Sequence, residues 1–200
     1  MKGFAVLASG RGSNFQALID AMEAGTLPAR CLRLITDNPS AYALERAGTA
    51  GIPATVLDFG SFPDRTAYEN ALLREMKATG ADLFVLAGYM RILGQGIVDA
   101  FPHRILNIHP ALLPSFPGLH AQRQALEHGV RVTGCSVHLV DSGADTGPIV
   151  LQRCVRVGEN DTEETLAARI LTEEHRILPE AVRLFLEGRI EVRGRRVILR

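Results

Sequence analysis

The sequence has no excess of charge of either sign. Lysine and arginine together number 22, as do aspartate and glutamate, so the formal net charge at pH 7 is zero. A protein that binds nucleic acid or an anionic membrane through its overall charge carries a basic excess. We therefore expect no nucleic acid and no membrane as partner, and any anionic ligand must be held by a local site.

Cysteine is scarce as well. The three cysteines, Cys31, Cys135 and Cys154, are far apart and form neither a Cys-x-x-Cys pair nor a zinc-type spacing with histidine. Each lies in an apolar, strand-like run, so we expect buried free thiols of the kind found in a reducing cytoplasm.

The chain also lacks long apolar runs. Its apolar start, residues 1–9, is too short for a secretory signal and leads directly into a glycine-rich loop. No other run approaches the length of a membrane span. These absences predict a cytoplasmic protein, and 200 residues without a linker, low-complexity tract or repeat suit one domain.

Strand-like and helix-like segments alternate along the sequence. Expected strands at residues 3–8, 31–36, 54–57 and 81–87 alternate with expected helices at residues 15–22, 41–50 and 64–79. This order predicts an α/β fold with a doubly wound, mostly parallel, Rossmann-like sheet. Further strands are expected at 105–109, 134–140 and 149–157, with a short helix at 119–127. The chain should end in a long helix over about 161–187, kinked or divided at Pro179, and a hairpin over 190–199.

Two polar side chains stand at the end of the expected strand 105–109. Side chains alternate along a strand, so Asn107 and His109 share one face, and Pro110 ends the strand. Ligands of open α/β sheets bind at the carboxyl ends of the strands. An amide there can donate to a developing oxyanion, and an imidazole can move a proton near neutral pH. A polar strand end with an ordinary surface histidine is the alternative.

The following segments add a stiff loop and a carboxylate. Residues 110–118 contain three prolines and a glycine around apolar side chains that need an apolar partner. A glycine-rich loop, residues 142–148, carries Asp145 after an expected apolar strand. If Asp145 folds back onto His109, it orients the ring and favours its charged form.

Three motifs in this region resemble those of the folate-dependent formyltransferases. They are Asn-Ile-His-Pro at 107–110, Leu-Leu-Pro-x-Phe-Pro-Gly-Leu-His at 112–120, and Gly-x-x-Val-His at 134–138 with a closing Asp-x-Gly-Pro-Ile at 145–149. The resemblance extends from the first strand to about Gly188. Within the family, the chain is most similar to the members that formylate glycinamide ribonucleotide.

The resemblance implies transfer of a formyl group from 10-formyltetrahydrofolate, the co-substrate, to the amino group of glycinamide ribonucleotide. The product is formylglycinamide ribonucleotide, on the route of de novo purine synthesis to IMP. Catalytic roles are implied for Asn107, His109 and Asp145. Folate contacts are implied for Arg65, Met90, Arg91, Ile92, Leu93, Asn107, Asp141 and Asp145. About residues 1–100 would hold the acceptor phosphate, and about residues 101–200 would bind folate and catalyse.

The glycine-rich segment after the first strand is a candidate phosphate site. Strand, glycine loop and helix follow one another, and backbone N–H groups at a helix start suit an anion. The segment lacks the third glycine of a dinucleotide fingerprint and the lysine of a P-loop, so the residues alone leave a simple capped turn open. The resemblance implies that Gly12, Ser13 and Asn14 hold the acceptor phosphate. It also implies that Glu174 contacts the glycinamide end, with Glu173 as the alternative.

Other functions are left open at this point. The nearest is a formyltetrahydrofolate hydrolase, but those proteins have a small regulatory domain ahead of this region, and Met1 stands directly before the first strand. A formyltransferase acting on initiator tRNA would need a further nucleic-acid-binding domain. A nucleotide-binding oxidoreductase or a catalytically dead folate-binding module fits the residues less well. His120 and His138 do not complete a zinc spacing with His109, so no metal is expected. The partners would be small-molecule substrates, and a homodimer is possible.

Overall fold

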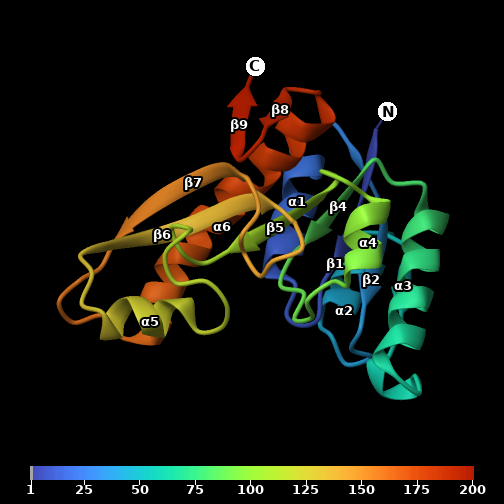
Figure 1. Cartoon of the computed structure of the whole chain (residues 1–200), viewed down its shortest axis with the longest axis horizontal. Helices are drawn as coiled ribbons and strands as arrows, with labels where there is room; N and C mark the ends of the chain where they lie inside the picture. The colour runs from blue at the N-terminus through green and yellow to red at the C-terminus, as the bar shows by residue number, and fades with distance from the viewer. Residues whose placement is uncertain (1) are drawn as a thin grey trace.

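A seven-stranded sheet runs through the computed structural model, which describes residues 2–200. The strands are β1 (Gly3–Leu7), β2 (Arg30–Thr36), β3 (Ala54–Val56), β4 (Leu83–Leu86), β5 (Ile105–His109), β6 (Val132–Leu139) and β7 (Ile149–Arg156). Their order in the sheet is β3-β2-β1-β4-β5-β6-β7 (Figure 1). Strands β1 to β5 pair in parallel, whereas β6 and β7 are antiparallel to their neighbours. The predicted mostly parallel α/β sheet is confirmed.

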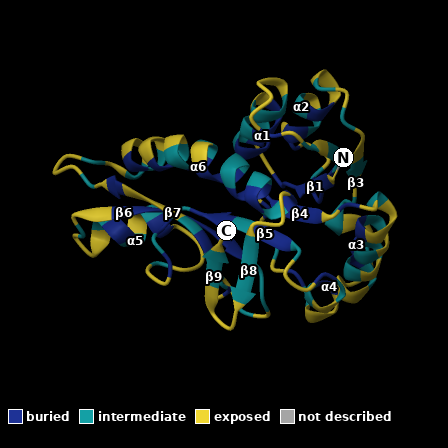
Figure 2. Cartoon of the chain, turned by 90° about the horizontal axis from the view of Figure 1, so that it is seen from above, coloured by how far each residue is buried: buried dark blue, intermediate teal, exposed yellow. Residues whose placement is uncertain are grey.

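Helices cover both faces of the sheet. They are α1 (Ser13–Glu23), α2 (Ala43–Thr49), α3 (Arg65–Thr79), α4 (Gln95–Ala100), α5 (Ala121–Glu127) and α6 (Glu163–Leu186), and a 3₁₀ turn covers Phe59–Ser61. Helices α1, α2 and α6 lie on one face, and α3 and α4 lie on the other (Figure 2). Strand β1 is apolar on both of its faces, so both faces need a cover of helices. Phe4 and Val6 pack in one apolar cluster, and Ala5 and Leu7 pack in the other. Complete burial stabilises a large apolar side chain by roughly 1.5–3 kcal/mol, so the continuous apolar run of β1 favours a central position.

The C-terminal part consists of α6 and a hairpin of β8 (Ile190–Arg193) and β9 (Arg196–Leu199). A reciprocal pair of hydrogen bonds between Thr162 and Thr165 caps the start of α6. The alternative of two helices divided at Pro179 is wrong, because α6 is continuous through this residue. Buried residues on both sides of it, such as Leu178 and Ala181, pack in the same core. This packing offsets the roughly 3 kcal/mol that an interior proline costs.

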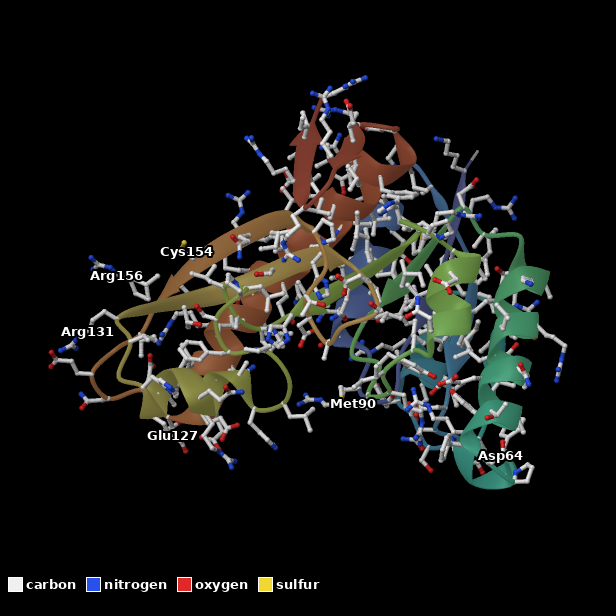
Figure 3. The ribbon with its side chains drawn as sticks, in the orientation of Figure 1. Asp64, Met90, Glu127, Arg131, Cys154 and Arg156 are labelled. Atoms are coloured by element: carbon white, nitrogen blue, oxygen red, sulfur yellow. The ribbon has the colours of Figure 1, made fainter. Side chains whose placement is uncertain are left out.

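Two further observations differ from expectation. No helix is predicted at residues 95–100, where α4 forms, because a six-residue segment with glycine at its second position has no clear helical period. Cys31, Cys135 and Cys154 are all free, but only Cys135 is fully buried. Cys31 is half-buried, and Cys154 projects outward from the edge strand β7 (Figure 3). Within residues 2–200, no helix combines the length and the apolar character that crossing a bilayer requires.

Candidate active site

The candidate catalytic residues meet where β5 ends. Asn107 and His109 lie on the same face of β5, as the period of two predicts. In the antiparallel pair of β5 and β6, Asn107 lies opposite His138 and His109 lies opposite Ser136. Directly opposed residues point to the same face of a sheet, so His138 joins the two predicted side chains.

Asp145 lies at the centre of this group. It sits in the loop between β6 and β7 in a left-handed conformation, with φ of 56°. Its Oδ2 atom accepts the Gly118 amide hydrogen at 2.8 Å and lies 3.4 Å from Nδ1 of His109. Its Oδ1 atom accepts from Nδ2 of Asn107 at 3.3 Å and lies 3.5 Å from Nε2 of His138. The structure therefore brings the three predicted residues into mutual contact through this carboxylate.

The carboxyl group of Asp145 is a strong acid in this environment. Burial raises its pKa. Hydrogen bonds from His138 and the Gly118 amide, together with the charges of His109 and His138, lower the pKa by more than burial raises it. The resulting pKa is about 2. The group is consequently ionised at neutral pH, and it can only accept hydrogen bonds there.

The imidazole of His109 is held between two acceptors. The ring is 5% exposed, and its Nε2 atom lies 2.8 Å from the carbonyl oxygen of Phe116. A carbonyl oxygen can only accept, so Nε2 carries the hydrogen in this contact. Phe116 directs its carbonyl from a left-handed conformation, with φ of 53°. Nδ1 is left as the nitrogen that faces Asp145.

His138 is a site residue that the sequence-based candidates do not include. Its Nδ1 atom lies 2.9 Å from the Leu139 carbonyl oxygen and therefore carries a hydrogen. In the neutral ring, Nε2 accepts from Nδ2 of Asn107 at 3.1 Å. In the charged ring, Nε2 carries a hydrogen as well and donates towards Oδ1 of Asp145, which is the form that lowers the pKa of that carboxyl group. The signal was a polar side chain inside an apolar strand, at the end of the Gly-x-x-Val-His motif.

A second group of predicted residues lines a cavity of about 360 Å³ beside β4. Its lining comprises Phe59, Arg65, Tyr68, Glu69, Leu72, Tyr89, Met90, Arg91, Ile92 and Leu93. All the predicted folate contacts outside the catalytic group, apart from Asp141, thus line this one cavity. Met90 and Ile92 are 67% and 66% exposed, and Figure 3 shows Met90 on the loop that follows β4, between the α5 side and the α3 side of the molecule.

The two cavity arginines are bound by other protein groups. Arg91 donates from Nε to Asp37 at 2.7 Å, and its guanidinium carbon lies 3.6 Å from the centroid of the Phe59 ring. Arg65 donates to Glu69 at 2.6 Å and to the Ile92 carbonyl at 3.1 Å. These contacts fix the shape of the loop that lines the cavity.

Asp141 braces the loop that carries Asp145. Its Oδ1 atom accepts from the Gly143 amide at 3.1 Å and from the Thr146 hydroxyl at 2.6 Å. Both bonds are internal to the loop, and the folate contact expected of Asp141 stays a prediction.

The glycine loop between β1 and α1 forms a separate polar site. Gly12 has φ of 67°, and a Cβ atom there would lie 2.8 Å from Cβ of Ala43, so glycine is required for both conformation and space. The backbone N–H groups of residues 10–14 donate no hydrogen bond within residues 2–200. Asn14 is buried and donates from Nδ2 to Glu174 on α6 at 2.7 Å. Free amides and a buried carboxyl group thus lie around one helix start.

Glu174, and not Glu173, faces this loop. Glu173 pairs with Arg176 at 2.7 Å on the outside of α6. Glu174 is 6% exposed, and burial raises the pKa of its carboxyl group, against the smaller lowering effect of the Asn14 hydrogen bond. The Oδ1 atom of Asn14 is buried without a partner among residues 2–200. The loop and the cavity are linked, because the Met90 amide donates to the hydroxyl of Ser9, two residues after β1, at 2.9 Å.

Comparison with known proteins places these features in context. The family model described as "Formyl transferase" matches residues 2–182. The chain is 41% identical over 186 residues to the phosphoribosylglycinamide formyltransferase of Bacillus subtilis, covering 93% of this chain and 95% of the relative. The structure of glycinamide ribonucleotide transformylase 1 from Symbiobacterium toebii is 55% identical, with a TM-score of 0.97 and coverage of 100% and 94%. A formyltetrahydrofolate deformylase from Pseudomonas syringae is 27% identical, with a TM-score of 0.92, covering 99% of this chain and 65% of that one.

Proposed function

Because the chain belongs to the formyl transferase family, we propose that it transfers the formyl group of 10-formyltetrahydrofolate to the amino group of glycinamide ribonucleotide. The observation that carries this function is the pairing of an Asn107–His109–Asp145 centre with a glycine loop closed by Glu174. The first suits acyl transfer, and the second suits a phosphorylated amine. The product, formylglycinamide ribonucleotide, belongs to purine synthesis.

The reaction makes three demands on the protein. The amine nitrogen attacks the formyl carbon, and the carbonyl electron pair moves to oxygen, so an oxyanion must be stabilised. The amine must then lose a proton. When the bond between the formyl carbon and the folate nitrogen breaks, that nitrogen must gain one.

Asn107 is the proposed oxyanion donor. Its amide is held by His138 and Asp145 at 3.1 and 3.3 Å, which fixes its position at the end of β5. The amide reaches the oxyanion by exchanging the longer of these contacts, the one with Asp145. Removal of one such donor typically costs roughly 3 kcal/mol of transition-state stabilisation.

His109 is the proposed proton carrier. Its ring is almost completely buried and is oriented by Asp145 on one side and Phe116 on the other. In its charged form it adds a second donor for the oxyanion, and in its neutral form it accepts the amine proton. Asp145, ionised at neutral pH, faces Nδ1 and accepts the hydrogen that the charged ring carries there.

The two substrates approach from different loops. The cavity lined by Met90–Leu93 and Arg65 is the proposed folate site, with Asp141 and Asp145 contributing from the loop between β6 and β7. The proposed acceptor site comprises the backbone of Gly12 and Ser13 for the phosphate, with the Asn14–Glu174 pair beside it. Residues from both ends of the chain therefore build the acceptor site.

Hydrolysis of the folate is the second candidate function. It is favoured by the structural similarity to the deformylase, which extends over nearly the whole chain. A hydrolase needs the catalytic centre and the folate cavity but no phosphate loop for an acceptor. The buried Asn14–Glu174 pair favours transfer to an acceptor over transfer to water.

The test measures release of deformylated folate with and without the acceptor. The protein is incubated with 10-formyltetrahydrofolate alone, then with glycinamide ribonucleotide added, and the formylated ribonucleotide is identified by mass spectrometry. We expect turnover that depends on the acceptor, with one formyl product per folate consumed. Equal rates with and without the acceptor would identify a hydrolase. An Asn107→Ala variant distinguishes enzymatic from spontaneous loss of the formyl group.

A further inference from the structure

Helix α2 binds the backbone of the glycine loop between β1 and α1 from one side. The Ala43 amide donates to the Gly10 carbonyl at 3.1 Å, and Nε of Arg46 donates to the Arg11 carbonyl at 2.9 Å. Two consecutive carbonyl groups of the loop are thereby directed at α2. None of the expected site residues comes from this helix.

The direction of these carbonyls determines the direction of the next amides. In a planar trans peptide, the C=O of one residue and the N–H of the next point in opposite directions. The Gly10 carbonyl therefore fixes the Arg11 N–H, and the Arg11 carbonyl fixes the Gly12 N–H, both away from α2. Neither N–H donates a hydrogen bond in the part of the chain that the structure describes. They are the kind of paired, outward amides that bind an anion.

Arg46 is itself immobilised. It donates from Nη1 to Oε1 of Gln16 on α1 at 2.8 Å, and its guanidinium carbon lies 4.9 Å from the centroid of the Tyr42 ring. Gln16 is held in turn by Asp20 at 2.8 Å. A guanidinium group has donors in a fixed planar arrangement, so one group can bridge α2, the loop and α1.

We propose that Arg46 is a positioning residue for the acceptor phosphate, acting by holding the Arg11 carbonyl so that the Gly12 amide faces the anion. This inference rests on the proposed function of the loop as the phosphate site. The positive charge adds a long-range attraction, but the fixed donor sets the direction of the peptide.

Two substitutions separate the fixed donor from the charge. Arg46→Ala removes both, whereas Arg46→Lys keeps the charge and loses the planar donor set. Arg74→Ala is the control, because Arg74 is exposed on α3 and its side chain forms no ion pair or hydrogen bond within residues 2–200. Dissociation constants for glycinamide ribonucleotide and for ribose 5-phosphate are measured by calorimetry, with KM and kcat for both substrates. Thermal unfolding checks folding, and Arg46→Lys carries the test if Arg46→Ala does not fold.

We expect both Arg46 variants to weaken binding of the two phosphate compounds about tenfold or more, with kcat and the KM for folate unchanged. Arg46→Lys close to wild type, or an Arg46→Ala effect no larger than that of Arg74→Ala, overturns the proposal. If wild type does not formylate glycinamide ribonucleotide, the proposed function fails, yet weaker ribose 5-phosphate binding in both variants still supports the role of Arg46. Wild-type protein that binds neither compound overturns both.

Discussion

Nδ1 of His109 lies 3.4 Å from the Oδ2 atom of Asp145, and the same oxygen accepts the Gly118 amide hydrogen. The backbone amide of Gly118 thus holds the carboxylate in the position from which it orients the ring. Because the two side chains share this contact, their contributions to the rate should not be independent.

The first prediction concerns this pair. Asp145→Asn and His109→Ala should each lower kcat by about 10²–10⁴-fold, the usual range for a group that moves protons in the transition state. The double variant should be scarcely slower than the slower single variant, because residues that act as a unit are non-additive. Steady-state kinetics with folate binding measured separately checks this. Asp99→Asn, an exposed aspartate on α4, is the control. Fully additive losses would show that the two residues act independently.

The second prediction is a dependence of stability on pH. The pKa of Asp145 is about 2 in the folded protein, below the value of about 3.9 for an unperturbed aspartate. A depressed pKa stabilises the folded state above the unfolded value, and this contribution is lost as the pH falls towards 2. The difference in free energy of unfolding between wild type and Asp145→Asn should therefore shrink from about pH 4 down to about pH 2. Denaturant titrations across this range measure it, and a constant difference would contradict it.

The third prediction compares two glycines in the left-handed region. Gly12 and Gly25 have φ of 67° and 70°, but only Gly12 has a neighbour that an added Cβ would meet, at 2.8 Å. Gly25→Ala should cost about 1–2 kcal/mol of stability and leave kinetics unchanged. Gly12→Ala should cost more and raise the KM for the acceptor, because Ala43 must move and the loop with it. Similar acceptor KM values in the two variants would remove Gly12 from the phosphate site.

The fourth prediction separates the two adjacent glutamates of α6. Burial raises the pKa of Glu174 in the folded protein. The protonated carboxyl group therefore contributes to folding stability below its unfolded-state pKa of about 4.3, and this contribution is lost as the pH rises and the buried group ionises. Glu174→Gln should therefore increase the free energy of unfolding at neutral pH while raising the KM for the acceptor. Glu173→Gln, which loses only a surface contact with Arg176, should change neither. A Glu174→Gln variant with wild-type acceptor KM would exclude Glu174 from binding.

Local patterns predicted much of the fold and part of the site. The period of two placed Asn107 and His109 on one face, and the strand–glycine–helix order located the loop around Gly12. His138 could not be found in this way, because its contact with Asn107 depends on the antiparallel direction of β6. No periodicity reports the direction of a strand whose partner is distant in sequence.

Contacts between residues far apart in the sequence also determine where the guanidinium groups of the cavity arginines lie. The folate contact of Arg91 stays a prediction, but the position of its guanidinium group is set by Asp37, 54 positions earlier, and by the ring of Phe59. Pro179 shows the same limit from the opposite side. Its local preference predicted a kink or a break, but core packing on both sides keeps α6 continuous.

The Asn14–Glu174 hydrogen bond joins residues 160 positions apart, and α1 packs on α6 around it. Contacts between residues so far apart in the sequence lose much conformational entropy when the loop closes, and they form slowly. During synthesis the N-terminal segments emerge first, so β1, the glycine loop and α1 are available long before α6. A nascent chain with its first strands paired would still lack the carboxyl group that closes the proposed acceptor site. On that proposal, the chain can recognise the acceptor only after its last long helix has docked.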